Sequence, residues 1–531
     1  MTPSGPERLE RERRIEERKK HLMENAWFTL GLWQGPRLRK DWDNLEEDEK
    51  RRISSMGMFF DAMFSFTISS LGRELRVGDN QNVHGITNWW QRFGCLLSIW
   101  LLTVDFASRF DNDDVAFKLF WALYGLAALG MMMHSTGGPT SRNAPWFTLS
   151  LAVLYGLLAL QYFRHAFYLA RCRFFCQIRG ILTMGLCLLG MMGFGLSYEA
   201  WQDREIIITI LALAYPAMII LLFFAKLAGR VIIYRDLPIE EANRILDVPQ
   251  NVPYLVSRYL SFHMLVLGQV TLAIALNPDV GYDDSQGLYS AITLGFILLV
   301  SLKLFLFDVS FREIEDHAIA SSSKFISVIW RLLFPFSVGS QALLGTGVAL
   351  LVNIAGKYGG DSINDNFAFW LPTTSLCMFL IINVLQRQLH TVPYTRLLED
   401  SRLFDQARSL KRLDHAQSFL QTILAIITLC VPPYISQDKT GALLLLGIMA
   451  LFLVILVVVN LWDEVFLLGE GKMSLARDAI AESNIQRSKL KRQMASLSIR
   501  DVSKMTAEND GKCRLAVEVV EPEIGRRGSI Q

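Results

Sequence analysis

One acidic residue of this sequence lies inside a strongly apolar segment. Asp61 stands in the run Met58-Phe59-Phe60-Asp61-Ala62-Met63-Phe64. A lone carboxylate among phenylalanines must be protonated, paired with a cation, or turned toward water. We expect Asp61 to approach a basic side chain, Arg258 or Arg331, or to line a water-filled cavity. A salt bridge that locks helices together and a role in conduction or coupling both fit this pattern.

A second set of polar residues is spaced along two later apolar segments. Arg258, His263 and Gln269 lie on broadly one side of a predicted helix, and Lys303 and Asp308 close the next apolar segment. Ionisable groups inside apolar spans suggest function by default, so these residues could form an inner vestibule or a proton path. The alternatives are that Lys303 extends to the lipid headgroups and that His263 makes an ordinary hydrogen bond between helices.

Motifs of soluble enzymes are missing from the sequence. It contains no Walker loop, no His-Glu-x-x-His and no Gly-x-Ser-x-Gly. The seven cysteines are scattered and indicate neither a disulfide framework nor a zinc site. We therefore expect no enzymatic activity, no cofactor and no metal. A net charge of +2 gives no reason to expect nucleic acid as a partner.

The elements that must position these polar groups are membrane-spanning helices. Of the 531 residues, 51% are apolar and only 20% are charged, and the charges are concentrated in residues 1–53 and 463–531. The apolar runs between them repeatedly reach the length of about 20 residues that crosses a bilayer. We predict an all-α, polytopic bundle in contact with the lipid bilayer. Its twelve predicted spans are 54–71, 93–110, 115–134, 145–163, 175–197, 206–227, 259–276, 288–307, 325–351, 367–386, 416–434 and 441–462.

The distribution of basic residues predicts the orientation of the spans. Cytoplasmic loops are enriched in Lys and Arg. If both termini are cytoplasmic, the inner loops hold about three times as many basic residues as the outer loops. We therefore predict a charged cytoplasmic segment 1–53 and a cytoplasmic tail 463–531 that is partly helical and then disordered. The membrane could be the plasma membrane or an endomembrane.

Three stretches resemble the low temperature requirement A (LtrA) family of multipass membrane proteins. Phe59–Phe64 is similar to that family's Phe-Phe-Asp-x-x-Phe, and Ser257–Gln269 to its Glu-Arg-x-x-x-Phe…Leu-Gly-Glu. Leu304–Asp308 with Phe334–Gly339 resembles an aromatic-Asp ending and the Pro-containing span after it. These matches keep their order over residues 54–352, whereas residues 353–462, the additional spans, match only in hydrophobic character.

Two positions depart from the family pattern. Ser257 and Gln269 stand where the family has carboxylates, and if those carry protons or cations, this chain lacks that step. The resemblance implies a membrane protein linked to growth in the cold, with a poorly defined activity. The Phe-Asp element also resembles the Phe-Ser-Asp motif of a lysosomal potassium channel family, with Phe60 in place of the serine.

These observations favour a transporter or channel for a small ion or solute. The alternatives are a membrane sensor or scaffold that transports nothing, and a cation channel resembling the lysosomal potassium channels. Near the C-terminus, Arg526-Arg527-Gly528-Ser529-Ile530 fits the recognition pattern of basophilic kinases. Phosphorylation of Ser529 by a kinase would add negative charge beside two arginines, although a chance match would look the same.

Overall fold

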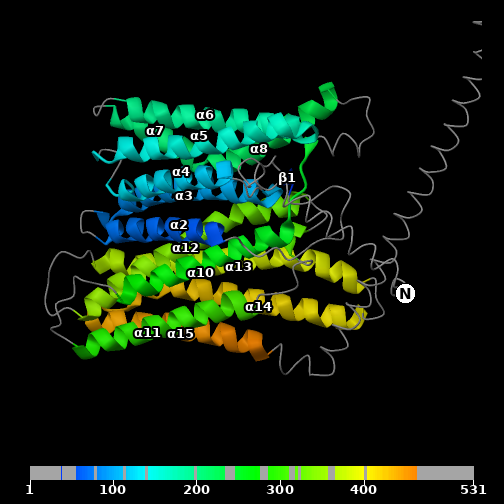
Figure 1. The fold of residues 1–531 in the computed structure, drawn as a ribbon. Helices are drawn as coiled ribbons and strands as arrows, with labels where there is room; N and C mark the ends of the chain where they lie inside the picture. Colours follow the sequence, from blue (N-terminus) through cyan, green and yellow to red (C-terminus); the bar gives the residue numbers. More distant parts are fainter. Residues whose placement is uncertain are drawn as a thin grey trace, which may run out of the picture. The chain divides into compact units, whose positions relative to one another are not determined.

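The structure is a computed structural model in which thirteen α-helices form the described part of the chain (Figure 1). It describes residues 37–38, 55–76, 80–111, 115–137, 141–196, 200–233, 246–275, 285–309, 317–320, 324–356, 365–399 and 404–462. The chain divides into two units, Met1–Val457 and Val458–Gln531. Of the second unit, the structure describes the last residues of α15.

All twelve apolar segments predicted from the sequence are helical. The helices are α2 (Ser55–Leu75), α3 (Val83–Arg109), α4 (Val115–Met133), α5 (Ala144–Tyr168), α6 (Arg173–Gly195), α7 (Trp201–Ala212), α8 (Ala214–Ala228), α10 (Val252–Ala275), α11 (Ser285–Lys303), α12 (Lys324–Gly356), α13 (Asp365–Glu399), α14 (Phe404–Cys430) and α15 (Lys439–Trp462). Two short strands, β1 (Arg37–Leu38) and β2 (Phe110–Asp111), pair antiparallel.

Among the described residues, eight helices are long and apolar enough to cross a membrane. They belong to α4, α5, α6, α8, α11, α12, α13 and α15. Helices α2, α3 and α10, which carry most of the buried charged residues discussed below, are not among them. The total of twelve spans and the cytoplasmic position of both termini stay predictions.

The predicted span 206–227 forms two helices, because it is interrupted at Leu213. Pro216 has no N–H, so the Ala212 carbonyl four residues earlier receives no helical hydrogen bond from it. Ser98 of α3 donates its hydroxyl to that carbonyl at 2.8 Å. Helix α3 can come this close because Gly94 has no side chain. A Cβ atom at this position would lie only 2.9 Å from the Ala212 Cβ. The proline and the neighbouring hydroxyl together explain the break.

The apolar interior consists of two clusters that meet along α12. The first holds buried side chains of α2 to α8, α10, α12 and α13, and the second those of α10 to α15. Helix α12 contributes Phe334 and Val338 to the first cluster and Leu344 and Val348 to the second. Its 33 residues are accordingly the most enclosed of the apolar helices, with 94% of the apolar window buried. Figure 1 shows α12 running among α2, α10 and α13.

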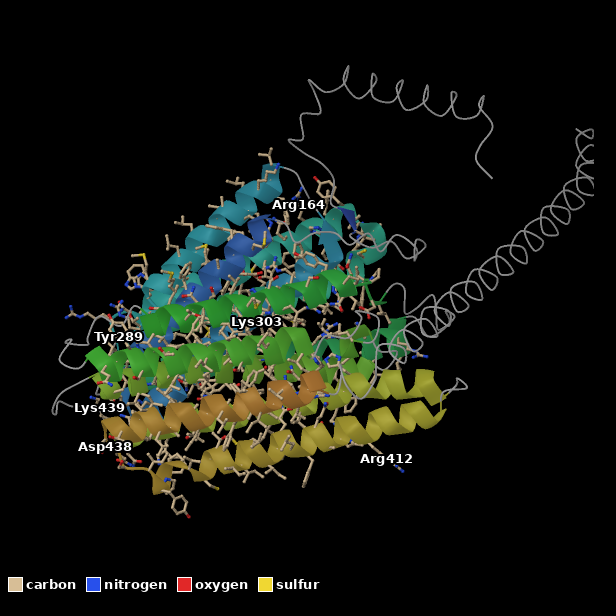
Figure 2. All side chains as sticks on the ribbon, turned by 90° about the horizontal axis from the view of Figure 1, so that it is seen from below. Arg164, Tyr289, Lys303, Arg412, Asp438 and Lys439 are labelled. Carbon is tan, nitrogen blue, oxygen red and sulfur yellow. The ribbon has the colours of Figure 1, made fainter. Side chains whose placement is uncertain are left out.

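The helix ends meet in two groups. At one end, hereafter the basic end, the last residues of α3 and α8 meet the first residues of α6 and α12. At the other end, hereafter the cavity end, α2 and α4 finish where α3 begins. There Arg92 pairs with Glu74 at 2.9 Å and donates to the Ser135 carbonyl at 2.6 Å. Figure 2 shows Arg412 at one end of the bundle and Asp438 with Lys439 at the other.

Candidate functional site

A buried ion pair joins α2 to α10. The Asp61 carboxylate is fully buried, and its Oδ1 lies 2.5 Å from Nη2 of Arg258, whose side chain is 4% exposed. The Trp100 indole N–H of α3 donates to the same oxygen at 2.7 Å. The second oxygen, Oδ2, has no hydrogen-bond partner among the described residues. We call Asp61 and Arg258 the central pair. Arg258 is one of the two partners expected from the sequence.

Aromatic rings surround the central pair. Trp100 stacks on Phe262 of α10 at 4.1 Å between ring centroids, and the ring of Phe334 of α12 lies 5.8 Å from that of Trp100. Phe60, the residue before Asp61, stacks on Trp121 at 4.6 Å. Rings at these distances leave little room for water, and a dry environment strengthens the attraction between the two charges.

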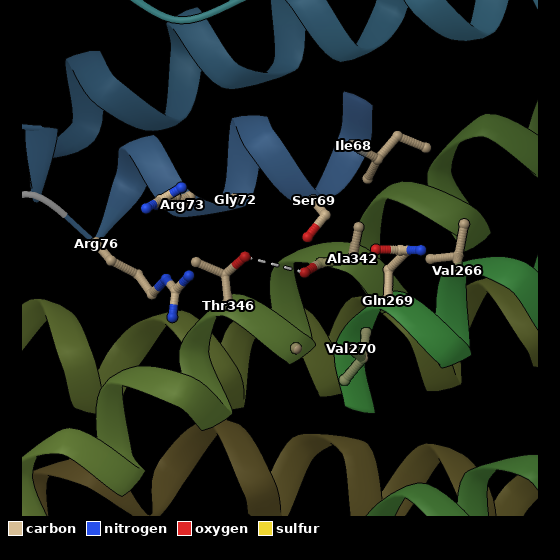
Figure 3. A pocket seen from close by; sticks show the side chains of 11 residues that line it. Ile68, Ser69, Gly72, Arg73, Arg76, Val266, Gln269, Val270, Ala342 and Thr346 are labelled. Carbon is tan, nitrogen blue, oxygen red and sulfur yellow. Dashed lines mark hydrogen bonds between the residues drawn. The ribbon is translucent and has the colours of Figure 1, made fainter. Parts of the chain in front are cut away.

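A small cavity of about 20 Å³ lies between α2, α10 and α12 toward the cavity end (Figure 3). Its lining includes Gly72 and Gln269. These residues follow Asp61 and Arg258 by eleven positions on their helices, which is about 16 Å and returns to the same helix face. The faces of α2 and α10 that hold the central pair therefore continue into this cavity.

Polar groups line the cavity together with aliphatic ones. Arg73 and Arg76 lie at one end of it and Ser69 and Gln269 nearer its middle (Figure 3). Gly72 allows the close approach of α2 and α12 here, since a Cβ atom on it would lie 2.5 Å from the Thr346 hydroxyl. The cavity has room for about one water molecule and offers hydrogen-bonding groups to it.

A larger polar cluster lies at the basic end. Asp105 of α3, 3% exposed, is 2.9 Å from Arg179 of α6, 3.4 Å from Arg109 and 3.8 Å from Arg331 of α12. Gln250 donates to Asp105 and accepts from Arg331 at 2.6 Å. We call the following residues the basic cluster: Asp105, Arg109, Arg179, Lys226, Asp247, Gln250 and Arg331.

The more exposed rim of the basic cluster is formed by a second acid, Asp247, and by Lys226. Asp247 lies 2.8 Å from Lys226 of α8 and 3.4 Å from Arg109. Arg109 also donates to the Val248 carbonyl. The ring of Phe175 lies 4.7 Å from the Arg109 guanidinium and 5.3 Å from that of Arg179, distances at which cation–π attraction acts.

The structure places the other predicted site residues apart from the central pair. His263 donates through Nδ1 to Gln341 of α12 at 2.8 Å, and Gln341 donates back to the His263 carbonyl at 3.2 Å. This is a hydrogen bond between helices, as one alternative held. Arg331 belongs to the basic cluster and not to Asp61.

Two more predicted residues lie on α11 and the turn that follows it. Lys303, labelled in Figure 2, is half-buried and is the last residue of α11. The core side chains of α11 belong to the second apolar cluster, whereas those of α2, the helix of Asp61, belong to the first. The backbone of Asp308 forms part of a π-helical turn, Leu304–Val309. The Asp308 side chain and Ser529 lie outside the described residues.

Sequence reasoning missed Asp105 as a site residue. It lies in the predicted span 93–110, four residues before Arg109. An acid and a base at this spacing share one helix face, and that spacing was the available signal. The partners Arg179 and Arg331 come from helices whose rotation the sequence does not specify.

A histidine close to the basic cluster lies outside the apolar spans. His317 stacks edge-on against His390 at 4.3 Å and against Trp330 at 4.7 Å. Burial lowers the pKa of His317 well below its usual range, and the nearby His390 and Arg331 lower it further. The imidazole is therefore neutral near pH 7. The described residues contain no group of three or more His, Cys, Asp or Glu side chains that could hold a metal ion.

The outer surfaces of the helices complete the assignment of class. Large apolar side chains point outward, among them Leu126, which is 67% exposed, and Phe223, which is 65% exposed, while Asp61 and Asp105 are buried and paired. Apolar exterior, internally paired charges and eight helices of spanning length define a multipass α-helical membrane protein.

The family follows from a comparison with known proteins. Residues 52–462 match the family described as bacterial low temperature requirement A protein (LtrA). The chain belongs to this family, as the resemblance of the three stretches indicates. The match extends through residues 353–462, where the sequence alone indicates a likeness only in hydrophobic character. No curated protein and no solved structure shows significant similarity to the chain.

Proposed function

We propose that this protein moves a small ion or solute across a membrane through the helix bundle, with the central pair on the path. The observation that supports this most is the position of the pair. Asp61 and Arg258 are buried on the faces of α2 and α10 that continue into the polar cavity. A charge pair kept only to hold two helices together would not need a polar cavity along the same faces.

The pair would act as a barrier that a passing solute must open. In the closed arrangement each charge neutralises the other, and rings of Trp100, Phe262 and Phe334 close the space around them. The Oδ2 of Asp61, which has no hydrogen-bond partner among the described residues, is the group that would accept an arriving cation, proton or hydrogen-bond donor. Binding there would weaken the hold on Arg258, because two cations would then share one carboxylate.

The test is a flux assay with purified protein in liposomes, with and without a pH gradient. Asp61→Asn keeps the size of the side chain but removes its charge, and we expect it to abolish flux. The matched control is Leu126→Ala on the outer surface of α4, which we expect to transport as the parent does. Equal flux of the two variants, or none from the parent protein above empty liposomes across a panel of small ions and solutes, would refute the proposal.

A sensor or scaffold that transports nothing is the second candidate. The observation in its favour is that Trp100 and Arg258 both bind Asp61 Oδ1, a geometry suited to locking α2, α3 and α10 together. For the potassium-channel alternative, potassium efflux is one arm of the same assay. Phe60, which replaces the serine of that motif, is fully engaged in stacking on Trp121. In none of these functions do we assign a catalytic residue, and we propose that the protein is not an enzyme.

A further inference from the structure

The basic cluster holds more positive than negative charge. Among the described residues, four cationic side chains, Arg109, Arg179, Lys226 and Arg331, face two carboxylates, Asp105 and Asp247, which leaves an excess of two positive charges there. The side chains of Arg109 and Arg179 are only 6% and 8% exposed. Burying like charges together is strongly unfavourable unless an anion accompanies them.

Three donors in or beside the cluster have no acceptor among the residues that the structure describes. Nε of Arg179 and Nε of Arg331 are buried without a hydrogen-bond partner among the described residues. The hydroxyl of Tyr162 is in the same situation, and its ring packs against Phe106, the neighbour of Asp105. Buried donors are nearly always satisfied in folded proteins. Three unsatisfied donors beside an excess of positive charge indicate a missing acceptor that carries negative charge.

We infer that the basic cluster binds a phosphate-bearing anion, either free phosphate or the phosphate of a lipid headgroup. Planar guanidinium groups match the oxygens of phosphate in pairs of parallel hydrogen bonds. A phosphate monoester carries a charge of about −1.5 to −2 near pH 7, which matches the excess in the cluster. A monovalent halide ion would balance only half of that charge. It could not accept paired hydrogen bonds from several guanidinium groups at once.

Access to this site is from the side of its rim. Lys226 and Asp247 are 33% and 32% exposed, and Arg331 is 14% exposed, whereas Arg109 and Arg179 lie behind them. These side chains come from the ends of α3 and α8 and the beginnings of α6 and α12, where a spanning bundle meets the headgroup layer. Asp105 stays in place as the internal counter-ion that holds the three arginines at a common point.

The binding site is independent of the central pair and of the proposed transport. It lies on other residues, and its test measures binding and not flux. A negative result in one assay therefore leaves the other proposal standing.

The experiment measures thermal unfolding of the full chain in neutral detergent, with sodium phosphate against sodium chloride at equal ionic strength. A second arm uses nanodiscs of neutral lipid with and without phosphatidic acid. We expect phosphate, phosphatidic acid or both to raise Tm in a saturable way. Stabilisation by phosphatidic acid alone identifies a lipid headgroup, and stabilisation by phosphate alone identifies a free ion. No specific stabilisation in either arm overturns the inference.

Variants assign the effect to the cluster. Arg179→Gln and, at the exposed rim, Lys226→Gln should each weaken the apparent affinity by about tenfold, as expected for the loss of one charge-assisted contact. The rim variant guards against misfolding, since Lys226 is partly exposed. The control is Arg412→Gln, which removes an exposed positive charge from α14 outside the cluster. If the control loses as much apparent affinity as both cluster variants, the stabilisation comes from non-specific charge attraction. That result would contradict binding at the basic cluster.

Discussion

The central pair and the basic cluster use the same chemistry in different proportions. Asp61 meets one arginine, and the two charges cancel. Asp105 meets three arginines, so that each receives only part of its charge. The one-to-one pair is self-sufficient, which suits a barrier that must close by itself. The one-to-three cluster is incomplete, which suits a site that takes up something from outside. Charge ratio, more than burial, distinguishes the two.

The largest loss of stability is expected when Asp105 is replaced. Replacement by Asn removes the shared counter-ion of three arginines, and we expect the free energy of unfolding to fall by about 3–5 kcal/mol or more. Chemical or thermal unfolding in detergent measures this. Asp203→Asn, at an exposed position of α7, is the control and should change stability by less than about 0.5 kcal/mol. A similar small change for both variants would show that Asp105 does not hold the cluster together.

Double variants sharpen the contrast between the two ratios. Asp61→Asn strands the buried Arg258, and adding Arg258→Gln should restore most of the lost stability, because no unpaired charge is left. Asp105→Asn with Arg331→Gln should recover little, since Arg179 then lacks the carboxylate it pairs with and Arg109 keeps only Asp247. Unfolding free energies of the four single and two double variants decide this. Equal recovery at both sites would contradict the distinction.

His317, a buried histidine beside the basic cluster, gives the fold a pH dependence. Its pKa is depressed in the folded protein, while the unfolded chain takes up a proton near the ordinary pKa of about 6.5. Stability should therefore fall as the pH is lowered from about 7 to about 5, because the unfolded state then binds the additional proton. His317→Gln should make this slope shallower. His84→Gln, at an exposed position of α3, is the control for replacing a histidine by glutamine.

The smallest effect is expected at an exposed carboxylate for which the described residues provide no salt bridge. Asp438 precedes α15 and accepts from the Gly441 N–H at 2.7 Å and from the Ser436 hydroxyl at 2.8 Å. These hydrogen bonds, the Gly441 amide first, hold its pKa below the usual range. Asp438→Ala should lower Tm slightly near pH 7, as loss of a helix cap does.

The pH dependence of that effect follows from the depressed pKa. Asp438 stabilises the fold above its ordinary pKa of about 3.9, and the contribution disappears as the pH falls through the lower folded value. The difference between parent and variant should thus narrow below about pH 4. Asp438→Asn retains a hydrogen-bond acceptor, so its Tm near pH 7 should lie between that of the parent and that of Asp438→Ala.

The parts of this molecule that follow from local composition could be predicted from sequence. Twelve apolar segments are visible as runs, and each is helical. The cation beside Asp61 could be predicted because a carboxylate in an apolar segment has few ways to be stable. The choice of Arg258 over Arg331 could not, since it depends on how α10 and α12 are rotated about their axes.

Two features lay beyond a reading of single segments. The break at Leu213 requires Ser98 of another helix to satisfy the Ala212 carbonyl, and Pro216 alone could equally have produced a bend. The basic cluster joins side chains from four helices and the segment before α10. Counting basic residues by loop indicated their shared end of the bundle, but not that Arg109, Arg179 and Arg331 converge on Asp105.

The indole of Trp100 has one more consequence. Its N–H proton is buried and donated to Asp61, so it can exchange with deuterium only when that bond opens and water arrives. The exchange rate of this single proton therefore counts the openings of the central pair, in a resting protein and without any substrate. If the indole exchanges as slowly as the backbone amides of the surrounding core, the central pair opens only when the core itself opens. If it exchanges much faster, the central pair already opens in the absence of substrate.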